Sequence, residues 1–203
     1  MGEHASLLDL LARTARSRGF PDGGATVAQL LSYVEAVVAA GERVNLTAAR
    51  DLASAVDVLA LSALAVTRAV DRAPRTVVDL GTGNGFPGVA AALAWPEARV
   101  LLVERRGRKA QAVRACLATA RIENAEVVPC DGRELARERP EVVGATDLVT
   151  VRAVGTLADA ARIAAPWLAP GGRLAHWKGR GLQPSERKAG ERAARDWGGL
   201  IMN

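Results

Sequence analysis

Cysteine and histidine are scarce in this chain, with two residues of each among 203. Cys116 and Cys130 lack the spacing of a metal or redox motif, which favours a reducing compartment. His4 lies in the N-terminal tail and His176 near the expected end of a strand, so they form no evident acid–base pair. The sequence therefore predicts no metal site, no disulfide framework and no covalent nucleophile.

The sequence also lacks the features of a membrane or secreted protein. We find no apolar run that approaches the roughly 20 residues needed to span a bilayer. The N-terminal segment contains Glu3 and Asp9 and does not follow a signal-peptide pattern. We therefore expect a cytoplasmic protein that does not act on a membrane. The length of 203 residues suits a single domain covering residues 1–203, and we take it to be a monomer.

Lysine is rare as well, because 24 of the 27 basic residues are arginine and the net charge is +5. Arginine is preferred for bidentate phosphate contacts, so this excess suits a protein that binds nucleic acid. An arginine-rich genome combined with a solvated surface explains the same ratio. Two local clusters, at residues 105–109 and 178–188, make a polyanionic partner plausible.

The first part of the chain, up to Pro74, has the apolar spacing of helices. That spacing predicts helices at residues 5–16, 26–41 and 51–70. We expect Thr26 and Asp51 to cap the second and third of these helices, and Gly41 to close the second. Residues 1–74 are therefore predicted to form a helical N-terminal extension.

From Arg75 onward, short apolar strands alternate with helices. We expect strands at 76–80, 99–104, 125–129, 147–151 and 172–177, and helices at 89–95, 108–121, 132–137, 157–167 and 184–195. This alternation predicts an α/β core over residues 75–203, with a mainly parallel, doubly wound sheet covered by helices on both faces. The C-terminal end of that sheet looks short, with one further strand expected at 200–202.

The turn after the first expected strand reads DLGTGNGFPG and carries two overlapping glycine signatures. A dinucleotide fingerprint, GxGxxG, should begin at Gly81 where the strand ends, but its last glycine would then fall on Phe86. The other register begins at Gly83 and contains Pro87, which lacks an amide that a pyrophosphate would need. The GxGxG pattern that ends at Gly85 instead suits S-adenosylmethionine, a methyl donor without a phosphate.

Two carboxylates accompany this turn. Asp79 precedes it and could approach the charged methionine end of the methyl donor. Glu104 ends the second expected strand, and its carboxylate could accept hydrogen bonds from both ribose hydroxyls. A capping role for Asp79 and a solvated Glu104 are the alternatives. Taken together with the glycines, the two acids favour a cofactor site.

These residues resemble the bacterial 16S ribosomal RNA guanine-N7 methyltransferases, also called glucose-inhibited division protein B. The resemblance rests on VVDLGTGNGFPGVAAAL and LLVERRGRKAQAVRA, and extends to NLTAARD upstream and to VRAVGTL and LAPGGRLAHWKG downstream. It implies the Rossmann-like fold of class I S-adenosylmethionine-dependent methyltransferases, S-adenosylmethionine as cofactor, and 16S ribosomal RNA or the small ribosomal subunit as partner.

The resemblance also implies roles for individual residues. Gly81 and Phe86 would line the methionine side, Glu104 the ribose, Gly132 and Arg133 the adenine, and Arg152 the rim of the pocket. The full predicted cofactor set is Asp79, Gly81, Gly83, Gly85, Phe86, Glu104, Gly132, Arg133 and Arg152. On the RNA side we expect Asn45, Arg50, Lys178 and Arg180.

The chain departs from the family pattern mainly on the substrate side. Where the family usually carries an Arg-His pair and an Asp, this chain has Val58, Leu59 and Ser62, and Asp131 replaces an arginine. A methyltransferase of the same fold with a changed small-molecule or RNA substrate, and a non-catalytic cofactor-binding or ribosome-assembly module, are therefore alternatives. Transfer to a ring nitrogen with an available lone pair needs no general base, so we predict no catalytic acid or base.

Overall fold

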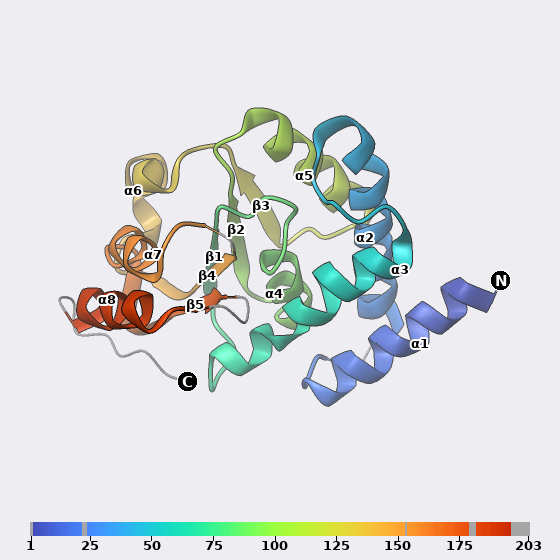
Figure 1. Ribbon diagram of the computed structural model, residues 1–203, viewed down its shortest axis with the longest axis horizontal. Helices are drawn as coiled ribbons and strands as arrows, with labels where there is room; N and C mark the ends of the chain where they lie inside the picture. Colours follow the sequence, from blue (N-terminus) through green and yellow to red (C-terminus); the bar gives the residue numbers. More distant parts are fainter. Residues whose placement is uncertain (1, 22–23, 153, 179–181, 196–203) are drawn as a thin grey trace.

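A parallel β-sheet lies at the centre of the computed structural model, which describes residues 2–21, 24–152, 154–178 and 182–195 (Figure 1). Within these residues the sheet has five strands in the order β3-β2-β1-β4-β5, and every neighbouring pair is parallel. The strands are β1 (Thr76–Leu80), β2 (Arg99–Val103), β3 (Ala125–Val128), β4 (Thr146–Arg152) and β5 (Leu168–Trp177). All five were predicted, although β5 begins earlier than expected. The strand expected at 200–202 lies outside the described residues.

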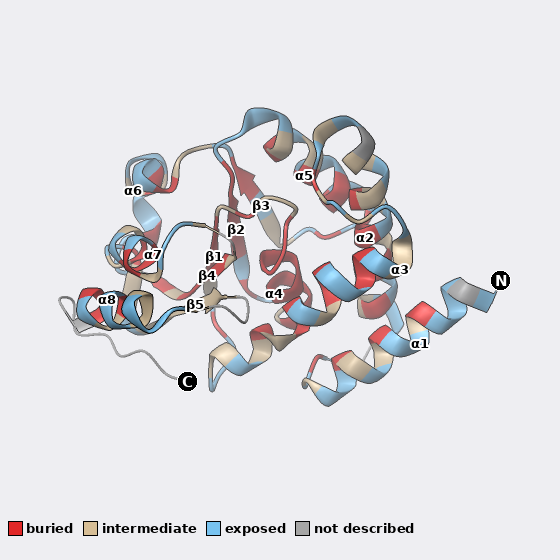
Figure 2. Ribbon diagram, viewed as in Figure 1, coloured by how far each residue is buried: buried red, intermediate tan, exposed pale blue. Residues whose placement is uncertain are grey.

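Successive residues of the strands point into two different cores, one on each face of the sheet. Val77 and Leu102 belong to the larger apolar cluster, whereas Val78 and Leu101 belong to the smaller one. Because both faces are covered, the strands are almost continuously apolar, as parallel strands usually are. Figure 2 shows the central strands as buried along most of their length.

The N-terminal helices cover one face of the sheet together with two helices of the α/β core. The N-terminal elements are α1 (Gly2–Ser17), α2 (Gly24–Val44), α3 (Leu52–Ala55), the π-helix η1 (Val56–Leu61) and the 3₁₀ helix η2 (Leu64–Ala69), and the core helices are α4 (Gly88–Ala94) and α5 (Gly107–Thr119). Their apolar side chains form one continuous cluster with the sheet. The N-terminal extension is therefore part of the packing beneath the strands.

Two capping predictions in this region have different outcomes. Asp51 does cap α3, because its Oδ1 accepts a hydrogen bond from the Ser54 amide at 2.8 Å. Thr26 is not a cap, because α2 begins at Gly24, and Gly41 does not end it, because the helix continues to Val44. The third predicted helix is present but is divided into α3, η1 and η2.

Two helical windows correct the expectation about apolar runs. Gly24–Gly41 and Leu52–Ala69 are each 18 residues long and apolar enough, by length and composition alone, to cross a membrane. Side chains from both windows, among them Leu30 and Leu64, are fully buried in the large apolar cluster. The buried residues of each window, 33% and 39% of its positions, account for this part of its apolar character by packing with the sheet.

The opposite face of the sheet is covered by shorter elements. These are η3 (Gly132–Glu134), α6 (Leu135–Glu138), η4 (Pro140–Val142), α7 (Leu157–Ala164) and α8 (Pro184–Arg195). The smaller cluster is centred on Trp167, which is 1% exposed, and on Leu135. Helix α8 packs on α7 through Ala193, in a small cluster that Leu174 of β5 also joins.

The topology fixes where a ligand can approach the sheet. The chain moves outward from β1 to β2 and β3, then returns to the other side of β1 and continues through β4 to β5. The connections after β1 and β4 therefore leave in opposite directions. This divergence at the carboxyl ends of the strands is where open α/β sheets bind their ligands.

Candidate functional site

A cavity of about 570 Å³ opens at the carboxyl ends of β1, β2 and β4. The structure brings together there most of the cofactor residues predicted from the sequence: Gly81, Gly83, Phe86, Glu104, Gly132, Arg133 and Arg152. Of the predicted cofactor set, Asp79 and Gly85 are not among the residues that line it. The seven lining residues come from widely separated parts of the chain, so the fold itself assembles the site.

The glycine turn that begins at Gly81 forms one wall of the cavity. Gly81 has a φ of +67°, and a Cβ atom there would lie 2.4 Å from Cγ2 of Val154. Gly83 has a φ of +59°, and its amide donates a hydrogen bond to Oε2 of Glu104 at 3.1 Å. Both positions need a residue without a Cβ, so the backbone itself is presented to the cavity.

Glu104 connects this turn to the next helix. Its side chain is buried, with 6% of the residue exposed. Oε1 accepts a hydrogen bond from the Arg106 amide at 2.8 Å, while Oε2 accepts the one from Gly83. Because each carboxylate oxygen has two lone pairs, one on each oxygen remains for a ligand. The geometry thus suits a group with two adjacent hydroxyls.

Asp79 is not among the residues that line the cavity, and its expected approach to the methyl donor stays a prediction. It is fully buried, and its carboxylate accepts hydrogen bonds from the hydroxyls of Thr82 at 2.5 Å and Thr150 at 2.6 Å. Burial raises the pKa of Asp79 to about 6, although hydrogen bonds from Thr150, Thr82 and the Gly88 amide act in the opposite direction. The carboxylate therefore holds the turn from beneath and does not face the cavity.

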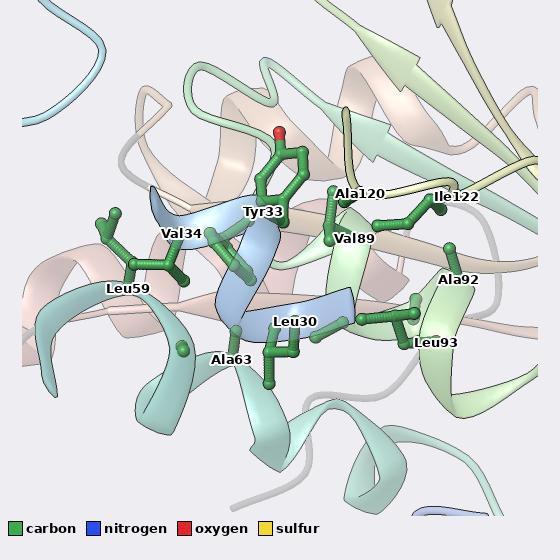
Figure 3. Packing of buried hydrophobic residues seen from close by; sticks show 14 of the residues in the cluster. Leu30, Tyr33, Val34, Leu59, Ala63, Val89, Ala92, Leu93, Ala120 and Ile122 are labelled. Atoms are coloured by element: carbon green, nitrogen blue, oxygen red, sulfur yellow. The ribbon is translucent and has the colours of Figure 1, made fainter. Parts of the chain in front are cut away.

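Gly85 serves packing between the turn and the N-terminal helices. A Cβ atom at Gly85, where φ is +94°, would lie 1.9 Å from the hydroxyl oxygen of Tyr33. That hydroxyl donates a hydrogen bond to the Asn84 carbonyl at 3.0 Å, and the Tyr33 ring meets Phe86 edge-on at 5.4 Å between centroids. Figure 3 shows the Tyr33 ring rising from α2 with its hydroxyl directed away from the helix. Tyr33 thus supports the turn, a role that the sequence analysis missed.

The opposite wall follows β3. Gly132 again excludes a side chain, because a Cβ atom there would lie 2.3 Å from Cδ1 of Leu80. Asp131 caps η3 by accepting a hydrogen bond from the Arg133 amide at 3.0 Å, and its carboxylate lies within 3.8 Å of Arg105. Asp131 also lines the cavity, where a carboxylate can accept from an exocyclic amine. The available signal was its position three residues after the end of β3, close to the place that Glu104 has after β2.

Arg152 closes the side of the cavity next to the π-helix. Its Nη1 atom lies 3.2 Å from the Ser62 hydroxyl oxygen, 3.4 Å from the Val58 carbonyl and 3.5 Å from the Leu59 carbonyl. These are the three positions at which the chain departs from the expected Arg-His and Asp pattern. Arg152 therefore links the end of β4 to the segment in which the chain differs from the family pattern.

The residues expected on the RNA side fall into three groups. Asn45 lies next to the cavity, in a neighbouring hollow, and Arg50 is exposed. Lys178 forms an ion pair with Glu186 at 2.7 Å and donates to the Gly155 carbonyl, so its charge is already balanced within the protein. Arg180 lies outside the described residues. The RNA role of all four stays a prediction, and the geometry favours Asn45 and Arg50 over Lys178.

Neither described histidine lies in the cavity lining. His4 contacts Glu35 at the surface. His176 lies on β5 with both ring nitrogens buried and without a hydrogen bond, and burial lowers its pKa to about 4. Within the part of the chain that the structure describes, no group of three His, Cys, Asp or Glu residues could hold a metal ion.

Comparison with protein families gives one match over most of the chain. The model of the family described as rRNA small subunit methyltransferase G matches residues 26–195. A ribosomal RNA small subunit methyltransferase G from Chloroflexus aggregans is 34% identical over 197 residues, covering 95% of this chain and 80% of that protein. The protein of the same name from Xanthomonas euvesicatoria is 37% identical and covers 76% of this chain and 70% of its own length.

Solved structures show the same architecture at lower sequence identity. Geranyl diphosphate C-methyltransferase from Streptomyces coelicolor has a TM-score of 0.54 at 22% identity, covering 66% of this chain and 56% of that one. Fibrillarin from Aeropyrum pernix, solved with bound S-adenosylmethionine, has a TM-score of 0.51 at 21% identity, covering 66% and 64%. The predicted fold class, that of the class I methyltransferases, is confirmed.

Proposed function

Because the chain belongs to the rRNA small subunit methyltransferase G family, we propose that it transfers a methyl group from S-adenosylmethionine to N7 of a guanine in 16S ribosomal RNA. The match over residues 26–195 carries this proposal. It includes the glycine turn, Glu104 and Arg152, which are the residues around the cavity.

The residues around the cavity fit the methyl donor. Gly81 and Gly132 are positions where a Cβ atom would collide with Val154 or Leu80, which leaves backbone at the cavity wall. Glu104 keeps one free lone pair on each oxygen for two ribose hydroxyls, and Asp131 offers an acceptor for an adenine amine. None of the three features requires a phosphate. This donor set favours S-adenosylmethionine over a dinucleotide.

The chain contributes orientation rather than proton transfer. When bound, S-adenosylmethionine supplies an activated methyl group on a sulfonium. Glu104 and the glycine turn hold the donor, and Phe86 and Leu46 present apolar surface at the same cavity. Guanine N7 carries an available lone pair and loses no proton, so the described residues need only align and exclude water. Neither His4 nor His176 lines the cavity, which agrees with a transfer that needs no general base.

The proposed substrate determines the partner and the compartment. We expect the chain to bind 16S ribosomal RNA, free or within the small ribosomal subunit, in the cytoplasm. We further expect it to act as a monomer that folds as a single domain, since the N-terminal helices share one core with the sheet.

The direct test is methyl transfer by the purified chain. Labelled S-adenosylmethionine is incubated with naked 16S RNA and with small subunits that lack the modification, and the site is mapped by borohydride reduction and aniline cleavage, which act at N7-methylguanine. We expect label at one guanine, and loss of most transfer in Glu104→Gln. A folded chain that binds S-adenosylhomocysteine but labels neither RNA would refute the proposal.

A changed acceptor is the second candidate, and one observation favours it. Val58, Leu59 and Ser62 stand where the family usually has groups that bind RNA, and Leu59 is only 2% exposed. A small-molecule acceptor would give transfer that is insensitive to salt and to nuclease. Transfer to 16S RNA that nuclease abolishes would eliminate this candidate.

A further inference from the structure

A second hollow of about 570 Å³ lies beside the cofactor cavity, where the end of α2 faces the start of α5. The two helices pack side by side (Figure 1). Four cations line this hollow, which we call the basic groove: Arg43, Arg106, Arg108 and Lys109. Arg106 and Lys109 also line the cofactor cavity, so the groove and the cavity adjoin at these two residues.

None of the acidic side chains that the structure describes balances the charge of the basic groove. Elsewhere, exposed arginines are paired, as Arg99 is with Glu141 at 3.0 Å and Arg13 with Asp9 at 2.6 Å. Among the described residues, the side chains of the four groove cations form no ion pair or hydrogen bond, and no acidic residue lines the groove. Helix α5 contains no acidic residue along its 13 positions. The groove is therefore a concentrated positive surface next to the proposed reaction site.

The start of α5 adds backbone groups to this surface. Its N-cap residue, Arg106, makes no side-chain capping hydrogen bond, so the first amides of the helix have no side-chain acceptor there. A helix N-terminus of this kind carries a partial positive charge that favours anions. Gly107 is exposed, and a Cβ atom there would meet nothing within 4 Å, so a phosphate can approach the backbone closely.

We propose that the basic groove binds the phosphodiester backbone of the ribosomal RNA strand whose target guanine enters the cofactor cavity. This inference rests on the proposed function and assigns Arg43, Arg106, Arg108 and Lys109 to the RNA. Because the groove and the cavity share Arg106 and Lys109, one strand can place a base in the cavity and its neighbouring phosphates in the groove. Asn45 lies in the same hollow, which agrees with its predicted RNA role.

The test uses Arg43→Gln combined with Arg108→Gln, because these two residues line the groove and are not among the residues lining the cofactor cavity. Both are exposed, so we expect little change in stability. Affinity for naked 16S RNA is measured over a range of salt concentrations. The binding constant falls as salt rises, and each phosphate contact with a single strand contributes about 0.7 to the steepness of log K against log salt. Losing two contacts should therefore make this dependence less steep by about 1.4.

The matched control also removes two arginine charges, but from helices away from the groove. Arg13→Gln with Arg187→Gln changes α1 and α8, where each arginine is paired with an acid on its own helix. We expect this control to keep the salt slope of the unmodified chain. Both variants should bind S-adenosylhomocysteine with unchanged affinity in calorimetry.

The outcomes separate this inference from the proposed function. Equal RNA affinity and salt slope in the groove variant and the control would overturn the groove proposal, whether or not the unmodified chain methylates RNA. Binding of guanosine monophosphate as tight as that of RNA would also overturn it, because a single nucleotide cannot occupy both hollows. A groove-dependent salt slope without methyl transfer would leave the groove in place and remove the proposed function instead.

Discussion

The proposed site, taken as the cofactor cavity together with the basic groove beside it, has two halves that differ in how their polar groups are satisfied. In the donor half, which comprises the glycine turn, Asp79 and Glu104, the carboxylates accept hydrogen bonds from within the protein. In the acceptor half, which comprises residues 43–62 and the basic groove, Arg43 and Arg108 have no partner among the described residues, and Val58 is 57% exposed. The donor half tolerates few substitutions because its carboxylates are buried and hydrogen-bonded within the protein. Exposed positions of the acceptor half can be substituted more freely, which allows a different ligand. Three departures from the family pattern, Val58, Leu59 and Ser62, lie in the acceptor half, where Val58 is exposed and Leu59 is buried.

The largest effect is expected for Gly85→Ala, which would break the donor half. The new Cβ atom would collide with the Tyr33 hydroxyl, and the positive φ alone costs a residue with a Cβ about 1–2 kcal/mol. Because the collision adds to the backbone cost, the loss of unfolding free energy, measured by urea titration, should exceed about 2 kcal/mol. Binding of S-adenosylhomocysteine should weaken at least about 100-fold.

Gly144→Ala is the matched control for this prediction. Gly144 also has a positive φ, +65°, but a Cβ atom there would meet nothing within 4 Å. It therefore carries the backbone cost without the collision. If the two variants lose equal stability, the contact between Tyr33 and the turn does not hold the donor half together.

The second prediction concerns the pH dependence that Asp79 confers. Burial raises its pKa from 3.8 to about 6, so its contribution to stability is full below about pH 4 and is lost as the pH rises through 6. At about 1.4 kcal/mol per pKa unit, the difference in unfolding free energy between the unmodified chain and Asp79→Asn should grow by about 2 kcal/mol from pH 6.5 to pH 4.

His176 acts in the opposite direction over the same pH range. Its pKa is lowered from 6.5 to about 4, so its contribution is present above pH 6.5 and is lost as the pH falls. Because His176 is present in both proteins, it cancels from the difference between them. Parallel stability curves for the two proteins between pH 4 and 6.5 would show that Asp79 does not titrate in the folded chain.

The sequence predicted the sheet well because parallel strands leave a strong local signal. The bounds of β1 and α8 agree with the structure, since apolar runs and Pro184 mark them. The sequence placed Asp79 at the correct edge but could not give the direction of its side chain. That direction depends on Thr150, which lies on a neighbouring strand far along the chain.

The supporting role of Tyr33 was not predictable for a similar reason. Its contact with the turn joins residues that are 51 positions apart in the sequence, and Tyr33 has the apolar spacing of an ordinary core residue. The π-helix from Val56 to Leu61 likewise leaves no periodic signal, because the sequence there reads as one continuous helix. Such features depend on tertiary contacts rather than on local pattern.

Tyr33→Phe should lose less unfolding free energy than Gly85→Ala, because it removes only one hydrogen bond from the donor half. The Asn84 carbonyl loses its buried partner, while the edge-on contact with Phe86 is retained. We expect a loss of about 1 kcal/mol in unfolding free energy and up to about tenfold weaker binding of S-adenosylhomocysteine. Unchanged donor affinity with reduced stability would limit Tyr33 to a packing role.

The smallest effect on stability is expected for Val58→Arg, in the acceptor half. The residue is exposed, so the unfolding free energy should change by no more than about 0.5 kcal/mol. The added cation lies on η1, where the Val58 carbonyl is 3.4 Å from Nη1 of Arg152, a residue that lines the cavity. One new phosphate contact would raise the salt slope for 16S RNA binding by about 0.7. A loss of stability as large as that of Tyr33→Phe would mean that the acceptor half is as tightly constrained as the donor half, and the contrast between them would fail.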